Sequence, residues 1–288
     1  MGISTDLGPM RQVRLAGGTI NYHDTGAGAP VVFVHGLLVN ADLWRKVVPR
    51  VAAAGHRCLT PDWPFGSHTE PVPGVDLSPT GAADLISNFL RELDLRDVTV
   101  VANDTGGAIT QIMLSRDRDR VGRVVLTNCD AYEKFFPQPF TMLPTLARIP
   151  GVLAVALQSL RWRPALRLPI AFGLVTKHTP PREITESYLS PSRDRADIRA
   201  DLRRFLRGIH HRYTLEAARG FPDLELPVLL AWAREDRSFR PEFAERLAAD
   251  LPNATLRMID DSLTFIAEDQ PELLSELIVE FTRLHATP

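Results

Sequence analysis

Four short apolar runs constrain the fold of this chain most strongly. They are PVVFVHG (residues 30–36), DVTVVAND (97–104), VGRVVLTNCD (121–130) and PVLLAWARED (227–236). Continuous runs of this kind are typical of strands buried on both faces, as in a parallel sheet covered by helices. The repeated alternation of such runs with stretches of helical spacing predicts an α/β fold with a mainly parallel twisted sheet flanked by helices. The other expected elements are a β-hairpin at 11–25, strands at 56–63 and 254–260, and helices at 41–55, 78–93, 106–116, 241–251 and 269–285.

The alternation is interrupted once, between residues 131 and 218, where proline-separated helical stretches replace it. We therefore expect one core domain made of residues 1–130 and 219–288, with residues 131–218 as a helical cap. In open α/β sheets, ligands bind at the carboxyl ends of the strands. The cap is expected to cover that edge as a lid.

Composition indicates an ordinary globular protein of 288 residues, with 44% apolar residues and a formal net charge of −2. Because the net charge is near zero, we expect neither nucleic acid nor a membrane surface as a partner. The arginine-rich stretch 195–212 alternates with acidic and apolar residues, which favours a solvated helix face. The apolar stretch 149–160 is too short to span a bilayer.

Two cysteines in apolar runs, Cys58 and Cys129, predict buried thiols rather than a disulfide framework. The N-terminus lacks the pattern of a signal peptide, so we expect a cytoplasmic protein. No cluster of metal-ligand residues is visible in the sequence, and no metal or cofactor is expected. The expected partner is a small-molecule substrate, with the protein a monomer or a homodimer.

Four segments in the same order resemble motifs of the α/β-hydrolase fold, and the resemblance covers nearly the whole chain. FVHGLLVNADLWRKV (33–47) resembles its oxyanion segment, and LTPDWPFGSHTEP (59–71) resembles the loop after a central strand. VVANDTGGA (100–108) resembles the nucleophile elbow, and WAREDRSFRPEFAERL (232–247) resembles the segment that carries the triad acid. This fold serves many chemistries, so the motifs predict the fold more firmly than the reaction.

The resemblance places Asp104 at the apex of the elbow, as in haloalkane dehalogenases, haloacetate dehalogenases and epoxide hydrolases. In those families the carboxylate attacks an alkyl carbon and forms an ester that water then cleaves. The backbone N–H groups of Thr105 and Leu37 are then the expected oxyanion donors. The alternative is that Asp104 only caps the following helix.

Two carboxylates are candidates for the orienting acid, and at most one of them is expected to act. Asp236 matches the family's usual acid position, whereas Asp130 follows the strand where some haloalkane dehalogenases carry theirs. The alternative for either residue is a loop or capping role, which is favoured more for Asp130.

The expected catalytic histidine is missing. DDSLTFIAEDQPE (260–272) aligns with the family's closing segment and places Thr264 at the histidine position. A threonine hydroxyl does not accept a proton near neutral pH, so it cannot serve as a general base. His35 and His68 are expected near the strand ends and are weak candidates for a replacement base. His178, His210 and His211 lie in or beside the cap.

The substrate pocket is expected to be hydrophobic, because the cap is rich in aromatic and aliphatic residues. The haloalkane dehalogenase pattern also requires side-chain N–H donors for the halide, and Leu37 and Thr105 stand at those positions. Epoxide opening is an alternative reaction, because this part of the chain offers Tyr132, Tyr188 and Tyr213. The predicted substrate-binding residues are His35, Trp63, Phe65, His68, Asn103, Phe136 and Trp162.

Three functions remain open from the sequence. The first is a hydrolase that uses Asp104 on a small, mainly hydrophobic substrate with a degenerate triad. The second is a cyclase, lyase or isomerase in which Asp104 is an acid/base and water is excluded. The third is a binding protein that has kept the pocket without catalysis.

Overall fold

The computed structural model describes residues 2–169 and 171–286, and its centre is one eight-stranded sheet. The strand order is β1-β2-β4-β3-β5-β6-β7-β8, with β1, β2 and β4 paired antiparallel and every other pairing parallel. The predicted α/β-hydrolase fold with a mainly parallel sheet is therefore confirmed. The strands are β1 (Met10–Leu15), β2 (Gly18–Thr25), β3 (Ala29–Val34), β4 (His56–Pro61), β5 (Val98–Asp104), β6 (Val121–Cys129), β7 (Val228–Ala233) and β8 (Ala254–Ile259).

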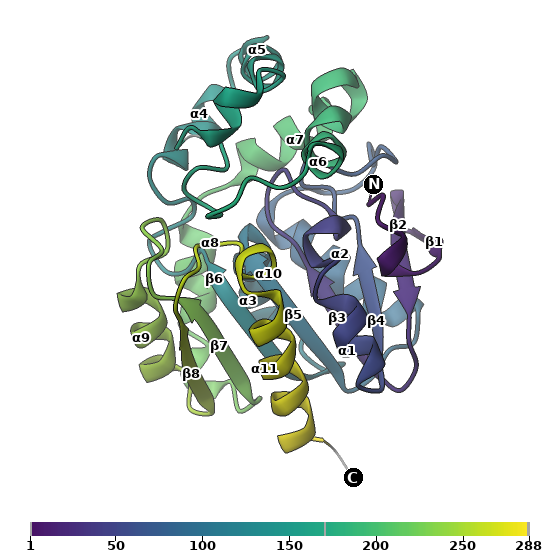
Figure 1. Ribbon diagram of the computed structural model, residues 1–288, viewed down its shortest axis with the longest axis vertical. Coiled ribbons are helices and arrows are strands. Elements are labelled where there is room, and N and C mark those ends of the chain that lie inside the picture. Colours follow the sequence, from purple (N-terminus) through teal and green to yellow (C-terminus); the bar gives the residue numbers. More distant parts are fainter. Residues whose placement is uncertain (1, 170, 287–288) are drawn as a thin grey trace.

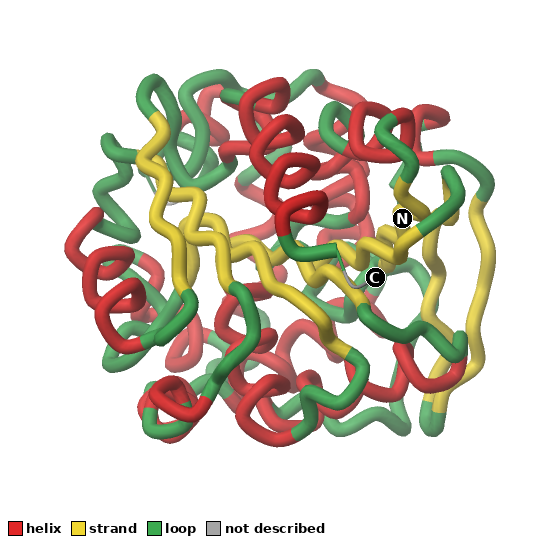
Figure 2. The backbone as a smooth tube through the Cα atoms, turned by 90° about the horizontal axis from the view of Figure 1, so that it is seen from below, coloured by secondary structure: helices red, strands yellow, loops and turns green. Residues whose placement is uncertain are grey.

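Helices cover both faces of this sheet (Figure 2). Successive residues of one strand supply both layers: Val31 and Phe33 of β3 pack with α1 and α11, whereas Val32 and Val34 pack with the opposite layer. This alternation follows from the two-residue repeat of a strand and explains why the central strands are apolar throughout. The covering helices are α1 (Val48–Ala53) and α11 (Pro271–Leu284) on one face, and α2 (Pro79–Glu92), α3 (Thr105–Arg116), α8 (Arg212–Ala218) and α9 (Pro241–Asp250) on the other.

The predicted helix at 41–55 is divided and a proline follows the break, whereas the helix predicted at 269–285 is present as α11. The stretch 41–55 forms the 3-10 helix η2 (Ala41–Trp44) and then α1, whose first turn holds Pro49. The stretch 269–285 is preceded by the short α10 (Ile266–Asp269), and α11 begins at Pro271. Proline has no N–H to donate, so it is tolerated in the first turn of a helix but interrupts a continuous one.

The helical segment between β6 and α8 lies over the carboxyl ends of the strands (Figure 1). Helix α8 itself packs on α3, and the Thr214 hydroxyl donates a 2.5 Å hydrogen bond to the Tyr132 carbonyl. None of the described helices is long and apolar enough to cross a membrane. The segment over the strand ends consists of η3 (Phe140–Met142), α4 (Leu143–Leu146), α5 (Val152–Ser159), η4 (Arg163–Arg167), α6 (Arg182–Asp194) and α7 (Ala196–Gly208).

Candidate active site

Asp104 occupies a sharp turn between β5 and α3. Its backbone has φ 54° and ψ −132°, a conformation that a residue with a side chain adopts only when its surroundings enforce it. Two glycines allow the neighbouring backbone to pass close to this turn. A Cβ at Gly36 would overlap the Asp104 carboxylate, and one at Gly106 would overlap the His35 carbonyl oxygen. The turn therefore has the geometry of a nucleophile elbow, with Asp104 at its apex.

The Asp104 carboxylate receives two backbone N–H groups. Leu37 N–H donates to Oδ2 at 3.1 Å, and Thr105 N–H also bonds to the carboxylate. Burial raises the pKa of Asp104 from 3.8 to about 6; these N–H groups oppose the rise and the nearby Asp236 adds to it. Asp104 is therefore ionised at neutral pH but is a stronger base than an ordinary carboxylate. The two predicted oxyanion donors already bond to the carboxylate, and their catalytic role stays a prediction.

Asp104 lies at the wall of a cavity of about 240 Å³ between the sheet and the cap. Among the described residues that line it, Asp104 is the only ionisable side chain. The hydroxyls of Thr105 and Ser159 are its other polar side-chain groups. The remaining lining is apolar: Leu37, Leu38, Phe136, Pro137, Pro139, Phe140, Met142, Leu143, Leu146, Leu153, Ala156, Leu157, Leu160, Ala171, Phe172, Val175, Leu189, Leu202, Leu206 and Phe265.

Asp236, just beyond β7, holds Thr264. Its Oδ2 accepts a 2.7 Å hydrogen bond from the Thr264 hydroxyl, and its Oδ1 accepts the N–H groups of Ser238 and Phe239 at 2.7 and 3.0 Å. Burial raises the pKa of Asp236 to about 6 in spite of these donors. The Thr264 proton is thus directed at Asp236, and the Thr264 hydroxyl is not placed to take a proton from water.

Asp130 is fully buried but is not brought to Thr264. Its carboxyl faces the Thr105 hydroxyl. Burial raises its pKa well above 3.8, and the charge of Asp104 raises it further. This environment favours the neutral carboxylic acid. Of the two predicted orienting acids, Asp236 is the one in contact with Thr264.

The two histidines predicted near the strand ends are both committed to structural hydrogen bonds. His35 accepts the Trp63 N–H on Nε2 and donates from Nδ1 to the Gly36 carbonyl, both at 2.9 Å. Burial lowers its pKa to about 3, so the ring is neutral. His68 contacts Asp201 of α7 through Nε2 at 3.2 Å and so fastens the loop after β4 to the cap. Neither residue is among the described residues that line the cavity.

Three predicted aromatic residues also lie outside the cavity lining. Trp63 is buried in the core and donates its indole N–H to the Phe33 carbonyl at 3.1 Å. Phe65 stacks on Phe205 of α7 with ring centroids 4.6 Å apart, and Trp162 is on the outer surface of the cap. Of the aromatic residues predicted to bind substrate, Phe136 alone lines the cavity in the described structure.

Two asparagines support the site from below the cavity. Asn103, predicted to bind substrate, donates to the Thr264 carbonyl at 2.8 Å and fixes the loop that carries Thr264. Asn128, which the sequence analysis missed, donates to Asp236 Oδ2 at 2.8 Å and accepts the Ala233 N–H at 2.7 Å. The signal was an amide near the end of an apolar strand, because a buried polar group requires partners.

Replacing Asn128 by Ala is expected to lower the free energy of unfolding by about 2–4 kcal/mol. The change leaves the buried Asp236 carboxylate and the Ala233 N–H each without a partner that Asn128 supplied. Urea denaturation followed by circular dichroism measures the loss. A decrease below about 0.5 kcal/mol, the range of neutral surface changes, would contradict this structural role.

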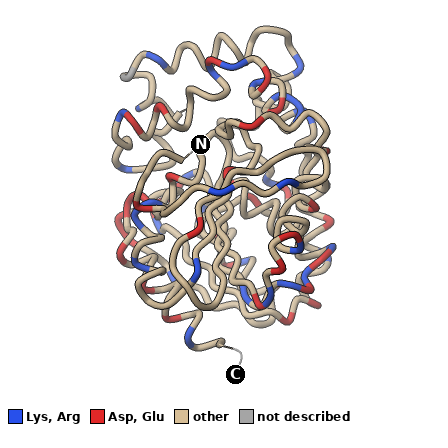
Figure 3. The backbone as a smooth tube through the Cα atoms, turned by 90° about the vertical axis from the view of Figure 1, so that its right-hand side faces the viewer, with Lys and Arg blue, Asp and Glu red and all other residues tan. Residues whose placement is uncertain are grey.

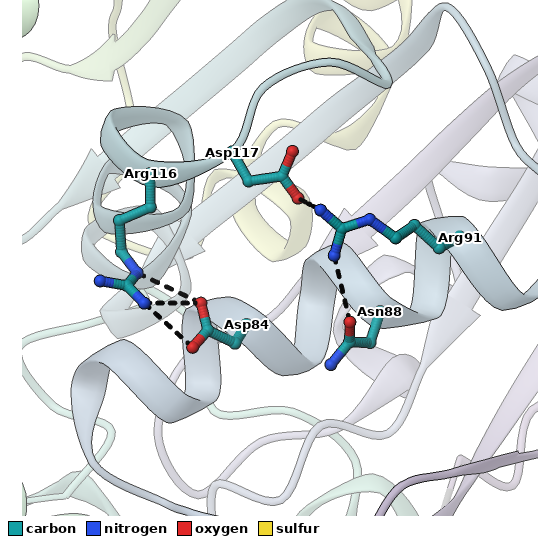
Figure 4. A pocket seen from close by; sticks show the side chains of 5 residues that line it. All are labelled: Asp84, Asn88, Arg91, Arg116 and Asp117. Atoms are coloured by element: carbon teal, nitrogen blue, oxygen red, sulfur yellow. Dashed lines mark hydrogen bonds and ion pairs between the residues drawn. The ribbon is translucent and has the colours of Figure 1, made fainter.

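The matched control is Asn88→Ala, on the exposed face of α2 (Figure 4). Asn88 accepts one 3.2 Å hydrogen bond from Arg91, which also pairs with Asp117. In the same surface hollow Arg116 pairs with Asp84. Because water replaces such exposed contacts, this variant is expected to change stability by less than about 0.5 kcal/mol.

Among residues 2–169 and 171–286, no group of His, Cys, Asp and Glu side chains is arranged to hold a metal ion. The site therefore consists of two carboxyls, Asp104 in an apolar cavity and Asp236 bonded to a threonine, and burial raises the pKa of both to about 6.

Comparison with known proteins agrees with this fold. Residues 29–271 match the alpha/beta hydrolase fold family. The uncharacterized hydrolase YugF of Bacillus subtilis (strain 168) is 26% identical over 281 residues, which cover 96% of this chain and 99% of YugF. Haloalkane dehalogenase 2 of Mycobacterium tuberculosis (strain H37Rv) is 27% identical over 267 residues, or 91% of each chain.

Solved structures show the same fold. The haloalkane dehalogenase DatA from Agrobacterium tumefaciens C58 superposes with a TM-score of 0.80 at 20% identity, covering 98% of this chain and 100% of DatA. A protein from Burkholderia ambifaria with an alpha/beta hydrolase fold superposes with a TM-score of 0.78. The chain belongs to the α/β-hydrolase fold family and is an enzyme of the hydrolase superfamily, similar to haloalkane dehalogenases.

Proposed function

We propose that this protein acts on a small, mainly hydrophobic molecule through Asp104, and that Asp104 transfers a proton rather than completing a hydrolysis. One observation carries the proposal: Asp104 is the only ionisable side chain among the described residues lining an apolar cavity. The cavity, about 240 Å³, is smaller than the roughly 300–1,000 Å³ of pockets for drug-sized ligands, which favours a small substrate.

Hydrolysis through Asp104 would require two groups that the site does not provide. In the first step the carboxylate oxygen would bond to an alkyl carbon while the leaving group departs with the electron pair. Leu37 and Thr105 provide no N–H side chain for a halide, and none of the three cap tyrosines lines the cavity. In the second step a base would have to take a proton from water, and the Thr264 hydroxyl instead donates to Asp236.

Proton transfer makes fewer demands on the site. A pKa of about 6 lets Asp104 accept a proton from carbon at neutral pH and return it to another atom of the same substrate. The apolar walls limit access of water, so a reactive intermediate is protected from hydrolysis. This chemistry needs no cofactor. In this proposal the cap, residues 131–218, supplies most of the apolar lining.

Deuterium exchange tests the proposal directly. Small cyclic ketones and β,γ-unsaturated ketones would be incubated with the protein in D₂O and followed by proton NMR. We expect exchange or isomerisation above the buffer rate, and its loss in Asp104→Asn. The matched control is Asp84→Asn, an exposed carboxylate on α2, which should retain the wild-type rate. No protein-dependent exchange with any ketone would count against proton transfer.

The similarity to haloalkane dehalogenases supports a second candidate, hydrolysis through an ester on Asp104. Turnover of haloalkanes or epoxides in H₂¹⁸O would separate the two. Water that attacks the ester carbonyl leaves ¹⁸O in the Asp104 carboxylate, which peptide mass spectrometry detects. Label in Asp104 would establish hydrolysis, whereas proton transfer leaves the carboxylate unlabelled.

A further inference from the structure

The charges of this chain are segregated between the cap and the core, although its net charge is only −2. Residues 131–218 contain fourteen Lys and Arg against seven Asp and Glu, and the rest of the chain contains nineteen against twenty-eight. Within the cap, residues 134–182 contain seven basic residues and no acidic residue. Around the sheet, by contrast, basic and acidic residues are intermingled (Figure 3). We expected no membrane partner because the net charge of the whole chain is near zero. That total hides the excess of basic residues in the cap and of acidic residues in the rest of the chain.

The basic part of the cap also carries an unusual set of exposed apolar side chains. Val155 is 73% exposed and Trp162 is 68% exposed. Helices α4 and α5 of this region form the end of the molecule farthest from the C-terminus (Figure 1). We call this surface the cap patch, defined by Met142, Ile149, Val155, Trp162 and Leu168.

The cap patch lies at the opening of the active-site cavity. Met142, Ala156 and Ser159 are each exposed to solvent and each line the cavity, so the cavity reaches the surface beside them. Val155 is adjacent to Ala156 on α5. A molecule bound to the cap patch would therefore be next to the cavity mouth.

The charge and the apolar character together identify the partner. Exposed aliphatic side chains and a tryptophan on a basic surface are typical of helices that lie in a membrane interface. Arg161 is neutralised by Asp194 at 2.5 Å, but Arg148 and Arg167 form no ion pair with described residues. A second copy of this chain would bring like charges together, and a phosphate backbone would gain nothing from Ile149, Val155 or Leu168.

We propose that the cap patch docks on the surface of an anionic lipid bilayer and that apolar substrates enter the cavity from the lipid. Docking itself does not require the chemistry of Asp104. Only the identity of the entering molecule depends on the proposed function.

Trp162 is a built-in reporter of this docking. The other three tryptophans, Trp44, Trp63 and Trp232, are at most 1% exposed, so a change of polarity outside the protein affects Trp162. With vesicles of equimolar phosphatidylcholine and phosphatidylglycerol we expect a blue shift of emission, quenching by brominated lipid and co-sedimentation. Vesicles of phosphatidylcholine alone should bind much more weakly, and high salt should release the protein.

Variants test each half of the proposal. Val155→Glu and the double change Arg148→Glu with Arg167→Glu are each expected to weaken vesicle binding at least about tenfold. Leu284→Glu is the matched control, because Leu284 at the end of α11 is 72% exposed but distant from the cap patch. It should bind as the wild type does, and thermal denaturation verifies that every variant is folded.

Three results would overturn the proposal. The first is unchanged Trp162 emission with anionic vesicles, and the second is equal binding to both kinds of vesicle. The third is a dimer that Val155→Glu dissociates, without vesicle binding, which would assign the cap patch to a second copy. Asp104→Asn should dock normally, so a failure of the proposed chemistry is distinguishable from a failure of docking.

Discussion

Replacing Thr264 by His is expected to turn this protein into a multiple-turnover hydrolase of benzyl bromide. Benzyl bromide is a suitable probe because its leaving group departs without a dedicated donor. In the wild type, the Asp104 carboxylate is expected to be alkylated once and to remain as a benzyl ester. In the variant, Asp236 would hold the new imidazole as it now holds the Thr264 hydroxyl at 2.7 Å, and the imidazole would activate water. General-base catalysis typically contributes about 10²–10⁴-fold.

Mass spectrometry of the intact protein detects the benzyl ester, and the release of benzyl alcohol measures turnover. The double variant Thr264→His with Asp236→Asn is the control, because an imidazole without its orienting acid should lose most of the gain. Thr264 is fully buried, so a larger side chain is expected to cost about 1–3 kcal/mol of stability, which thermal denaturation detects. A folded Thr264→His variant that retains the benzyl ester like the wild type would show that the missing imidazole is not what prevents turnover.

Replacing Asp104 by Asn is expected to abolish the chemistry and, at neutral pH, to stabilise the fold. The folded state raises the pKa of Asp104 from 3.8 to about 6, which corresponds to a cost of about 3 kcal/mol for holding the ionised group. Because the folded state binds this proton more tightly than the unfolded state, the cost is absent below pH 3.8 and complete above about pH 6. Asparagine has no such cost and can still accept the Leu37 N–H.

Urea denaturation at several pH values tests the predicted direction of this change in stability. At neutral pH we expect Asp104→Asn to be about 1–2 kcal/mol more stable than the wild type. The gain is smaller than the full cost of the ionised Asp104, because the amide N–H₂ of asparagine is poorly solvated in the cavity. The difference should shrink as the pH falls through the window from about 6 to 3.8. Asp84→Asn, which only removes an exposed ion pair with Arg116, should show no such trend. A variant less stable than the wild type at neutral pH would contradict this reading of the Asp104 environment.

The sequence predicts the layout of the fold well, because burial on both faces leaves a continuous apolar pattern in the central strands. The strand-to-helix turn at Asp104, the adjacent segment with Leu37, and the strand end before Asp236 were all predicted close to their observed positions. Each follows from a local signal: an apolar run, a pair of glycines, or a polar residue directly after a strand. The divided helix at 41–55 was missed, because helical spacing continues across the break before α1.

The lining of the cavity was harder to predict. Sequence places His35, Trp63 and Phe65 near the strand ends but does not say which way their side chains point. The backbone N–H of Trp63 donates a hydrogen bond to the His35 ring, and Phe65 packs on Phe205, a residue 140 positions later. In the cap, Leu153 and Val155 are two residues apart on α5, yet only Leu153 lines the cavity. Which side chains line the cavity depends on how the cap packs on the sheet, and no local sequence pattern contains that information.

The contacts that fasten α7 to the core have a kinetic consequence. His68 binds Asp201, Phe65 stacks on Phe205, and Arg204 donates to the carbonyls of Val72 and Val75, so the inner cap helix is fixed at several points. Exchange of ligand through a hinge motion of the whole cap would require these contacts to break together. The outer helices α4 and α5 border the cavity and make none of these contacts, so we expect residence time in the cavity to be governed there. Arrival and departure of substrate would then follow the fast local fluctuations of two short helices, while the floor around Asp104 stays rigid.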